Sequence, residues 1–345
     1  MPRSMALKDL HLADLHDRAR ELDVPGFRML TRDELIEAIE GGESEEKPKS
    51  RRGRRKREAP KKPEPRKEKQ PAKEVEEAET EEVTGVLDRM PQGYGFLRLD
   101  GLEPADGDVY VSASQIRRCE LRPGDEVSGP ARAPRRGERH RALVRVASVN
   151  GGEPEGGRTQ FEELTPKAPH REIPGLDSIE LPEPLSYGER ALVTSAEAAT
   201  ASDLLREIAA ALEKSGARLT VLVAGPAAED TGDWESAAKD LEIVGGDAEM
   251  EPRDRVRAAE LSVGRAKRRV EQGEDVVVLV DSLSSLAEGY RDVSRVKRLF
   301  GSGRELAEEG SGSLTVIAAV IEADERAGDV EEALKGTEDV VVRRD

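Results

Sequence analysis

The sequence predicts a multidomain α/β protein with a small helical module, a small β-barrel and an α/β domain that has a mostly parallel sheet. Short strand-like runs separated by Gly, Pro and Asp fill residues 83–152, which is typical of a small closed barrel. From residue 188 onward, Val/Leu/Ile runs alternate with helical segments, which is typical of a parallel sheet covered on both faces. The chain's 345 residues accommodate two or three domains.

The helical module is expected at residues 1–41. An apolar helical face at residues 15–22 ends at the Pro-Gly pair of residues 25–26. A second helix follows, where Thr31 and Glu34 have the spacing of a capping box.

Residues 42–82 are expected to form a charged, disordered linker. Residues 47–73 hold 14 Lys or Arg, three Glu and five Pro, and residues 74–82 then hold six Glu. This composition lacks the apolar residues that a core needs. Two interpretations stay open: a solubilising tether, or a basic arm that contacts RNA or DNA phosphates without reading their sequence.

The barrel at residues 83–152 is expected to contain five strands, and the α/β domain at residues 153–345 another five. The barrel strands are predicted at residues 84–90, 93–99, 108–114, 125–131 and 141–149. The sheet strands are predicted at residues 190–196, 218–225, 275–282, 313–320 and 339–344, with helices that include 202–214 and 253–272.

Charge is unevenly distributed along the chain. The net charge is −17, and residues 153–345 contribute −18, because they hold 24 Lys and Arg against 42 Asp and Glu. Residues 1–152 therefore sum to +1, so we expect any polyanion to bind in this first part of the chain.

Cysteine and histidine usage restricts the class of protein further. Cys119 is the only cysteine, which excludes an intrachain disulfide and suits a reducing cytosol. The histidines do not have metal-ligand spacing, so no metal site is expected; they are His11, His16, His140 and His170. The sequence has neither an apolar run of membrane-spanning length nor the apolar stretch of a signal peptide. We expect a cytoplasmic protein with no membrane partner.

The aromatic residues of the barrel point to a binding surface for unpaired bases. Tyr94 and Phe96 are two residues apart on a predicted strand, so both rings leave the same face, and Arg98 continues that row. Tyr110 follows on the next strand. Rings beside an arginine form a stacking platform for single-stranded nucleic acid, with the guanidinium available to phosphate or a base face. The alternative is that these rings form the barrel core, although alternate residues such as Leu97 and Val109 already occupy the inside.

The barrel segment "GYGFLR…DVYVSASQIRRCELRPGDEVSG…RRGERHRALVRVASVN" resembles the RNA-binding, cold-shock-like (OB-fold) domain of the bacterial transcription termination factor Rho family. Residues 4–41 resemble the helical module that precedes it in that family. The resemblance implies contacts to pyrimidine-rich single-stranded RNA from Tyr94, Phe96, Arg98, Asp108, Tyr110, Glu138, Arg139 and His140. His140 stands where the family usually has a tyrosine, and an imidazole offers less stacking area.

The resemblance continues through "DVVVLVDSLSSLAEGYRDV" and "EEALKGTEDVVV", which in that family belong to a RecA-like ATPase that forms a hexameric ring and pulls on RNA. A P-loop needs glycines, a lysine for the phosphate charge and a Ser or Thr for Mg²⁺. The matching position reads Thr200-Ala201-Ser202, and Glu197 adds a negative charge. The alternative is an ordinary helix start, capped by Thr200 or Ser202. Asp281 retains the carboxylate that would hold Mg²⁺.

Other parts of the family's motor differ as well. Pro226-Ala227 stands where acidic and arginine residues would activate water, and only "SRV" stands where an RNA-gripping loop is expected. The chain ends at Asp345, before the segment that would carry an arginine finger. We therefore expect a pseudo-ATPase with no catalytic residue and no cofactor, although the family uses ATP and Mg²⁺.

The sequence thus predicts an RNA-binding protein that takes part in or modulates DNA-templated transcription termination. RNA polymerase or an active Rho ring is the expected protein partner, and the resemblance allows a homo- or hetero-oligomer. Two alternatives stay open. One is a working ATP-dependent RNA translocase or helicase of the Rho type, and the other is a protein-docking scaffold with incidental RNA binding.

Overall fold

The computed structural model describes residues 36, 80–154, 157–213, 215–225, 231–246 and 250–344. All of these except Ile36 belong to one compact unit, Lys73–Asp345. Ile36, within the predicted second helix, is helical and buried. The rest of the helical module, the basic segment 47–73 and Pro226-Ala227 lie outside the described residues.

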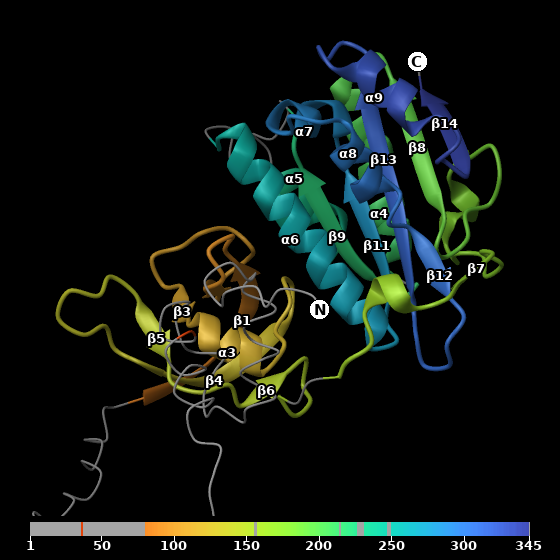
Figure 1. Ribbon diagram of the computed structural model, residues 1–345. Helices are drawn as coiled ribbons and strands as arrows, with labels where there is room; N and C mark the ends of the chain where they lie inside the picture. The colour runs from red at the N-terminus through yellow and green to blue at the C-terminus, as the bar shows by residue number, and fades with distance from the viewer. Residues whose placement is uncertain are drawn as a thin grey trace, which may run out of the picture. The chain divides into compact units, whose positions relative to one another are not determined.

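The first part of this unit is a closed barrel, as predicted (Figure 1). Its strands are β1 (Thr80–Arg89), β2 (Gly95–Arg98), β3 (Val109–Val111), β4 (Glu126–Arg132), β5 (Arg141–Leu143) and β6 (Ser148–Val149). They run in the order β1-β2-β3-β5-β4, and β1 closes the barrel by pairing with β4. Neighbouring strands are antiparallel except for β3 and β5. This is the OB-type architecture.

Three features of the barrel differ from the prediction. The single strand predicted at residues 141–149 is divided into β5 and β6, because residues 144–147 leave the extended ladder, so this sheet has six strands and not five. Strand β1 begins at Thr80, inside the predicted linker, because residues 80–82 extend the ladder to β4 with Thr80 opposite Arg132. The predicted strand at residues 108–114 ends early, because Ser112 and Gln115 form a capping box that starts helix α3 (Ala113–Arg118).

The barrel core is aliphatic. Leu87, Leu97, Val109, Val111 and Val127 are completely buried in it. Alternate residues of β2 and β3 therefore point inward, as period-two strands require. The rings of Tyr94, Phe96 and Tyr110 are not part of the core cluster, so the alternative in which they fill the barrel is wrong.

The second part of the unit is an α/β domain built on a mostly parallel sheet. The parallel strands run in the order β10-β9-β11-β13-β8-β14, as the pairings show. Their bounds are β10 (Glu242–Gly245), β9 (Arg218–Val223), β11 (Asp275–Val280), β13 (Ser313–Ile321), β8 (Arg190–Ser195) and β14 (Val340–Arg344). The five predicted sheet strands are all present.

Short strands at the sheet edges were not predicted. They are β10 and the antiparallel pair β7 (Pro166–Lys167) and β12 (Arg304–Leu306). Strand β12 also pairs antiparallel with the start of β13.

Helices cover both faces of the sheet. Helices α4 (Ala198–Leu212) and α5 (Thr231–Ala237) pack on one face, while α6 (Pro252–Glu271), α7 (Leu283–Gly289), α8 (Ser294–Phe300) and α9 (Ala327–Leu334) pack on the other. Two 3₁₀ turns, η3 (Phe161–Glu163) and η4 (Leu176–Ser178), precede β8. Alternate residues of β13 bury against the two faces: Val316 and Ala318 on the α6 side, Ile317 and Ala319 on the α4 side.

Helix α6 also packs against the barrel. Gly124 of the barrel has φ +85°, and a Cβ atom there would lie 2.3 Å from the backbone carbon of Gly264 on α6. Nearby, Arg122 forms an ion pair with Glu271 at 2.8 Å. Glycine at position 124 is therefore required both by backbone conformation and by the close approach of the helix. None of the helices within the described ranges has the length and apolar character of a membrane span.

Candidate nucleic-acid interface

Four rings gather on one side of the barrel. Phe96 of β2 lies directly opposite Tyr110 of β3, with ring centroids 6.0 Å apart. Tyr94, just before β2, lies 5.6 Å from Tyr110 and 5.8 Å from Phe96, and His140 lies 5.0 Å from Phe96. The rings are partly exposed, Tyr110 to 36%. The structure thus brings together the aromatic residues that the sequence singled out.

Arg98 lies beneath this cluster as the centre of a buried ion-pair network. Its side chain is only 4% exposed and binds the carboxylates of both Asp88 and Asp108. The sequence led us to expect a guanidinium free to contact phosphate or a base face. In the folded chain it is instead ion-paired, and it positions Asp108.

Asp108 has one oxygen that lacks a partner. Its Oδ2 atom accepts the backbone N–H of Ala105 at 2.9 Å and pairs with Arg98. Its Oδ1 atom is buried and has no hydrogen-bond partner among the described residues, and the same holds for Nδ1 of His140. A buried polar atom without a partner is costly. Asp108 and His140 both line a cavity of about 470 Å³, which also contains Phe96 and Arg139.

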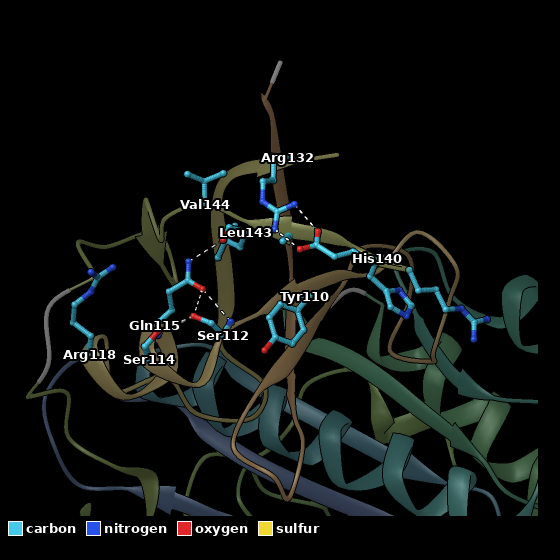
Figure 2. A pocket seen from close by; sticks show the side chains of 12 residues that line it. Tyr110, Ser112, Ser114, Gln115, Arg118, Arg132, His140, Leu143 and Val144 are labelled. Atoms are coloured by element: carbon cyan, nitrogen blue, oxygen red, sulfur yellow. Dashed lines mark hydrogen bonds and ion pairs between the residues drawn. The ribbon is translucent and has the colours of Figure 1, made fainter. Parts of the chain in front are cut away.

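A second cavity, of about 620 Å³, is lined by Tyr110 and shares Arg139 and His140 with the first. Figure 2 shows Tyr110 and His140 on one side of it, with Ser112 and Gln115 at the start of α3 on the other. Gln115 is held in place because its amide donates to the backbone carbonyl of Leu143 at 3.0 Å.

Glu138 contributes a fixed carboxylate to this second cavity. Arg132 binds it through both terminal nitrogens, at 2.6 and 2.9 Å, and the backbone N–H of Arg135 donates to it at 2.9 Å. The hydrogen bond from Arg132 is the main reason that the pKa of Glu138 falls to about 2. Glu138 is therefore a permanent acceptor at neutral pH. Arg139, in contrast, is 82% exposed and 3.8 Å from Asp106.

Sequence reasoning missed several residues of the interface. Arg132 and Gln115 line the cavity of Glu138, and Arg257, from helix α6, lines the cavity of Asp108. A capping-box search finds Gln115. No local pattern marks Arg132 or Arg257, because their neighbours in the fold are distant in the sequence.

The residues that the sequence suggested as a degenerate nucleotide site follow β8, at the start of α4. Helix α4 has Glu197 as its N-cap, without any side-chain cap. Thr200, Ala201 and Ser202 lie inside the helix, so the alternative in which Thr200 or Ser202 caps it is wrong. The helix begins earlier because Ser195 turns the chain: its hydroxyl donates to the carbonyl of Glu197 at 3.0 Å and accepts its N–H at 3.3 Å.

Asp281, at the end of β11, is buried, and its carboxylate oxygens accept hydrogen bonds from backbone N–H groups. It accepts the N–H of Ala224 at 2.6 Å and that of Gly225 at 3.0 Å. Burial raises its pKa to about 6. Beyond it, the hydroxyls of Ser282 and Ser284 donate to Asp324 at 2.8 and 2.6 Å. Within the described residues, no group of three or more His, Cys, Asp or Glu side chains is placed to hold a metal ion.

Comparison with known proteins identifies the family. Residues 83–155 match the family described as "Rho termination factor, RNA-binding domain", and residues 6–46 match "Rho termination factor, N-terminal domain". The transcription termination factor Rho of Bacillus subtilis is 33% identical over 96% of this chain and 77% of its own length. The chain belongs to the transcription termination factor Rho family.

Other Rho proteins show similar relationships. Rho of Aquifex aeolicus is 34% identical, over 76% of this chain and 68% of its own length. Rho of Chromobacterium violaceum is 32% identical, over 96% of this chain and 80% of its own length. Among solved structures, an ATPase of a bacterial type III secretion system is 16% identical over 59% of this chain and 66% of its own, with a TM-score of 0.44.

Proposed function

We propose that this Rho-family chain binds single-stranded, pyrimidine-rich RNA through its barrel and takes part in or modulates transcription termination. The observation that carries the proposal is the cluster of Tyr94, Phe96, Tyr110 and His140, which lies outside the core and in which Phe96 and His140 line the same cavity as Asp108. Partly exposed rings offer faces on which unpaired bases stack. The matched RNA-binding domain covers the same residues.

Asp108 supports a preference for cytosine. Its free Oδ1 atom is an acceptor in a buried site and needs an N–H donor. The exocyclic amino group of cytosine supplies one, whereas uracil presents a carbonyl oxygen at the same position. We therefore expect cytosine-rich RNA to bind more tightly than uridine-rich RNA.

The α/β domain is proposed to be inactive as an ATPase. A triphosphate with Mg²⁺ needs compensating positive charge, but the residues present are Ala201 in place of the lysine and Glu197 at the helix start. The oxygens of Asp281 are already hydrogen-bonded to backbone N–H groups. These residues do not fit the nucleotide that the family uses. An RNA polymerase or an active Rho ring remains the partner we expect.

The retained Ser202 and Asp281 favour one alternative, an active RNA translocase. One purified sample of the full chain separates the two functions. Binding of fluorescent oligo(C) is measured by anisotropy, and phosphate release from ATP is followed with and without poly(C). We expect tight RNA binding and no phosphate release. An RNA-dependent rate that disappears in Asp281→Asn would show that the domain is a motor.

A further inference from the structure

Helix α6 carries an arginine that reaches the base-binding side of the barrel. The Nη2 atom of Arg257 lies 2.8 Å from Oδ2 of Asp88 and 2.6 Å from Sδ of Met90. Arg257 lines the same cavity as Phe96 and Asp108. The cavity wall is therefore made by both the barrel and the α/β domain.

The position of Arg257 depends on the docking of α6. The close contact between Gly124 and Gly264 and the ion pair between Arg122 and Glu271 both lie further along this helix. Side chains on a packed helix are held more accurately than side chains on a loop. Arg257 is thus presented to the cavity by a rigid element.

The guanidinium of Arg257 keeps unused donors. Both of its contacts use Nη2, and the described part of the chain supplies no hydrogen-bond partner for Nε or Nη1. The side chain is 39% exposed. Moreover, the Oδ2 atom of Asp88 already accepts Arg98, so one carboxylate oxygen serves two guanidinium groups. The Nε and Nη1 donors of Arg257 therefore remain available to an anion.

We propose that Arg257 binds a backbone phosphate of the RNA strand whose base stacks on Phe96. This inference rests on the proposed RNA-binding function. An arginine presents a planar set of donors that matches phosphate geometry, while the neighbouring Phe96 ring takes the base. The RNA site is then shared by the two domains, and bound RNA strengthens the contact between the barrel and α6.

The test measures oligo(C) affinity of the full chain as a function of salt concentration. Arg257→Ala is compared with wild type, Arg257→Lys, Phe96→Ala and the control Arg122→Ala, which removes an ion pair between barrel and helix away from the cavity. Loss of one phosphate contact reduces the slope of log K against log salt by about 0.7 for single strands. We expect Arg257→Ala to bind about tenfold more weakly, as for a lost charged hydrogen bond, with this smaller slope. Arg257→Lys should keep the slope, and Arg122→Ala should keep both affinity and slope.

The outcomes separate this inference from the function on which it rests. No RNA binding by the wild type would reject the proposed function itself. If Phe96→Ala weakens binding but Arg257→Ala does not, only the role of Arg257 is overturned. Equal losses in Arg257→Ala and Arg122→Ala with an unchanged slope would also overturn it, since domain docking alone then explains the effect. If Arg257→Ala unfolds, Arg257→Gln, which keeps the length of the side chain, replaces it.

Discussion

The carboxylate of Asp281 accepts the backbone N–H of Gly225 at 3.0 Å, and this bond ties the end of β11 to the end of β9. The space beside Gly225 is so small that a Cβ atom there would lie 3.1 Å from the carboxylate. The residue that the sequence suggested as a remnant of a Mg²⁺ site is therefore a structural link between two strands.

The buried state of Asp281 predicts how stability changes with pH. The pKa of Asp281 in the folded state, about 6, is above the ordinary value of 3.8. Its contribution to the free energy of unfolding is therefore fully present below pH 4 and is lost as pH rises through 6. The difference corresponds to on the order of 3 kcal/mol. Urea unfolding of wild type and Asp281→Asn from pH 4 to pH 7 measures how the difference in unfolding free energy changes with pH. Relative to the variant, the wild type should gain stability as pH falls.

Asp275 provides a control in which stability is expected to change with pH in the opposite direction. Burial opposes the shift, but hydrogen bonds from Arg171 and Ser313 lower the pKa of Asp275 below 3.8. Its stabilising contribution is present at neutral pH and is lost as pH falls through that lowered pKa. Relative to Asp275→Asn, the wild type should lose stability in acid. The same sign of change in both comparisons would contradict the assignment for Asp281.

Removing the ring of Phe96 should weaken RNA binding. Stacking on an aromatic side chain contributes about 1–3 kcal/mol per base, so Phe96→Ala should bind oligo(C) about 5- to 150-fold more weakly. Leu99→Ala is the control, because Leu99 is a partly exposed apolar residue of the barrel that does not line either cavity. Titrations with the fold checked by circular dichroism make the comparison. An unchanged affinity of Phe96→Ala would remove the stacking platform.

Alanine at position 124 should destabilise the unit. Gly124 has a positive φ, and an added Cβ atom would collide with backbone atoms of α6 at 2.3 Å. Gly137 also has a positive φ, +92°, but has nothing within 4 Å of the position of its Cβ. Gly137→Ala should cost about 1 kcal/mol, which is the conformational strain alone.

Gly124→Ala should cost roughly 2 kcal/mol more than Gly137→Ala, because one of the two backbones must move. Thermal unfolding of both variants measures the difference. Equal melting temperatures would show that α6 does not pack closely against the barrel in solution.

Deleting the basic residues 47–73 should lower RNA affinity and flatten its salt dependence. The segment carries 14 Lys or Arg, and each phosphate that it neutralises adds about 0.7 to the slope of log K against log salt. A Gly/Ser segment of equal length is the matched control for tether length. Identical slopes for the full chain and the deletion would indicate that the acidic residues 74–82 neutralise the arm within the chain.

The sequence by itself determined the architecture of both domains. Alternation of apolar residues predicted the barrel strands, with Leu97 and Val109 inside, and continuous apolar runs predicted the central strands of the sheet. These features are encoded locally, because the side-chain period of a strand places every second residue on one face. The same logic placed Tyr94, Phe96 and Tyr110 outside the core. The edge strands β7, β10 and β12 were not predicted from the sequence, because runs of two to four residues carry too little periodicity.

Only the tertiary structure decided which side chains share a site. In the fold, Arg98 forms ion pairs with two carboxylates, and the carboxylate oxygens of Asp281 accept hydrogen bonds from backbone N–H groups. Arg257 lines the same cavity as Phe96. Arg257 and Phe96 are on different domains, and their proximity follows from the packing of α6 against Gly124. Periodicity reports which face a residue occupies but not which distant element covers that face. Long-range contacts of charged groups therefore become visible only when the domains are folded and docked.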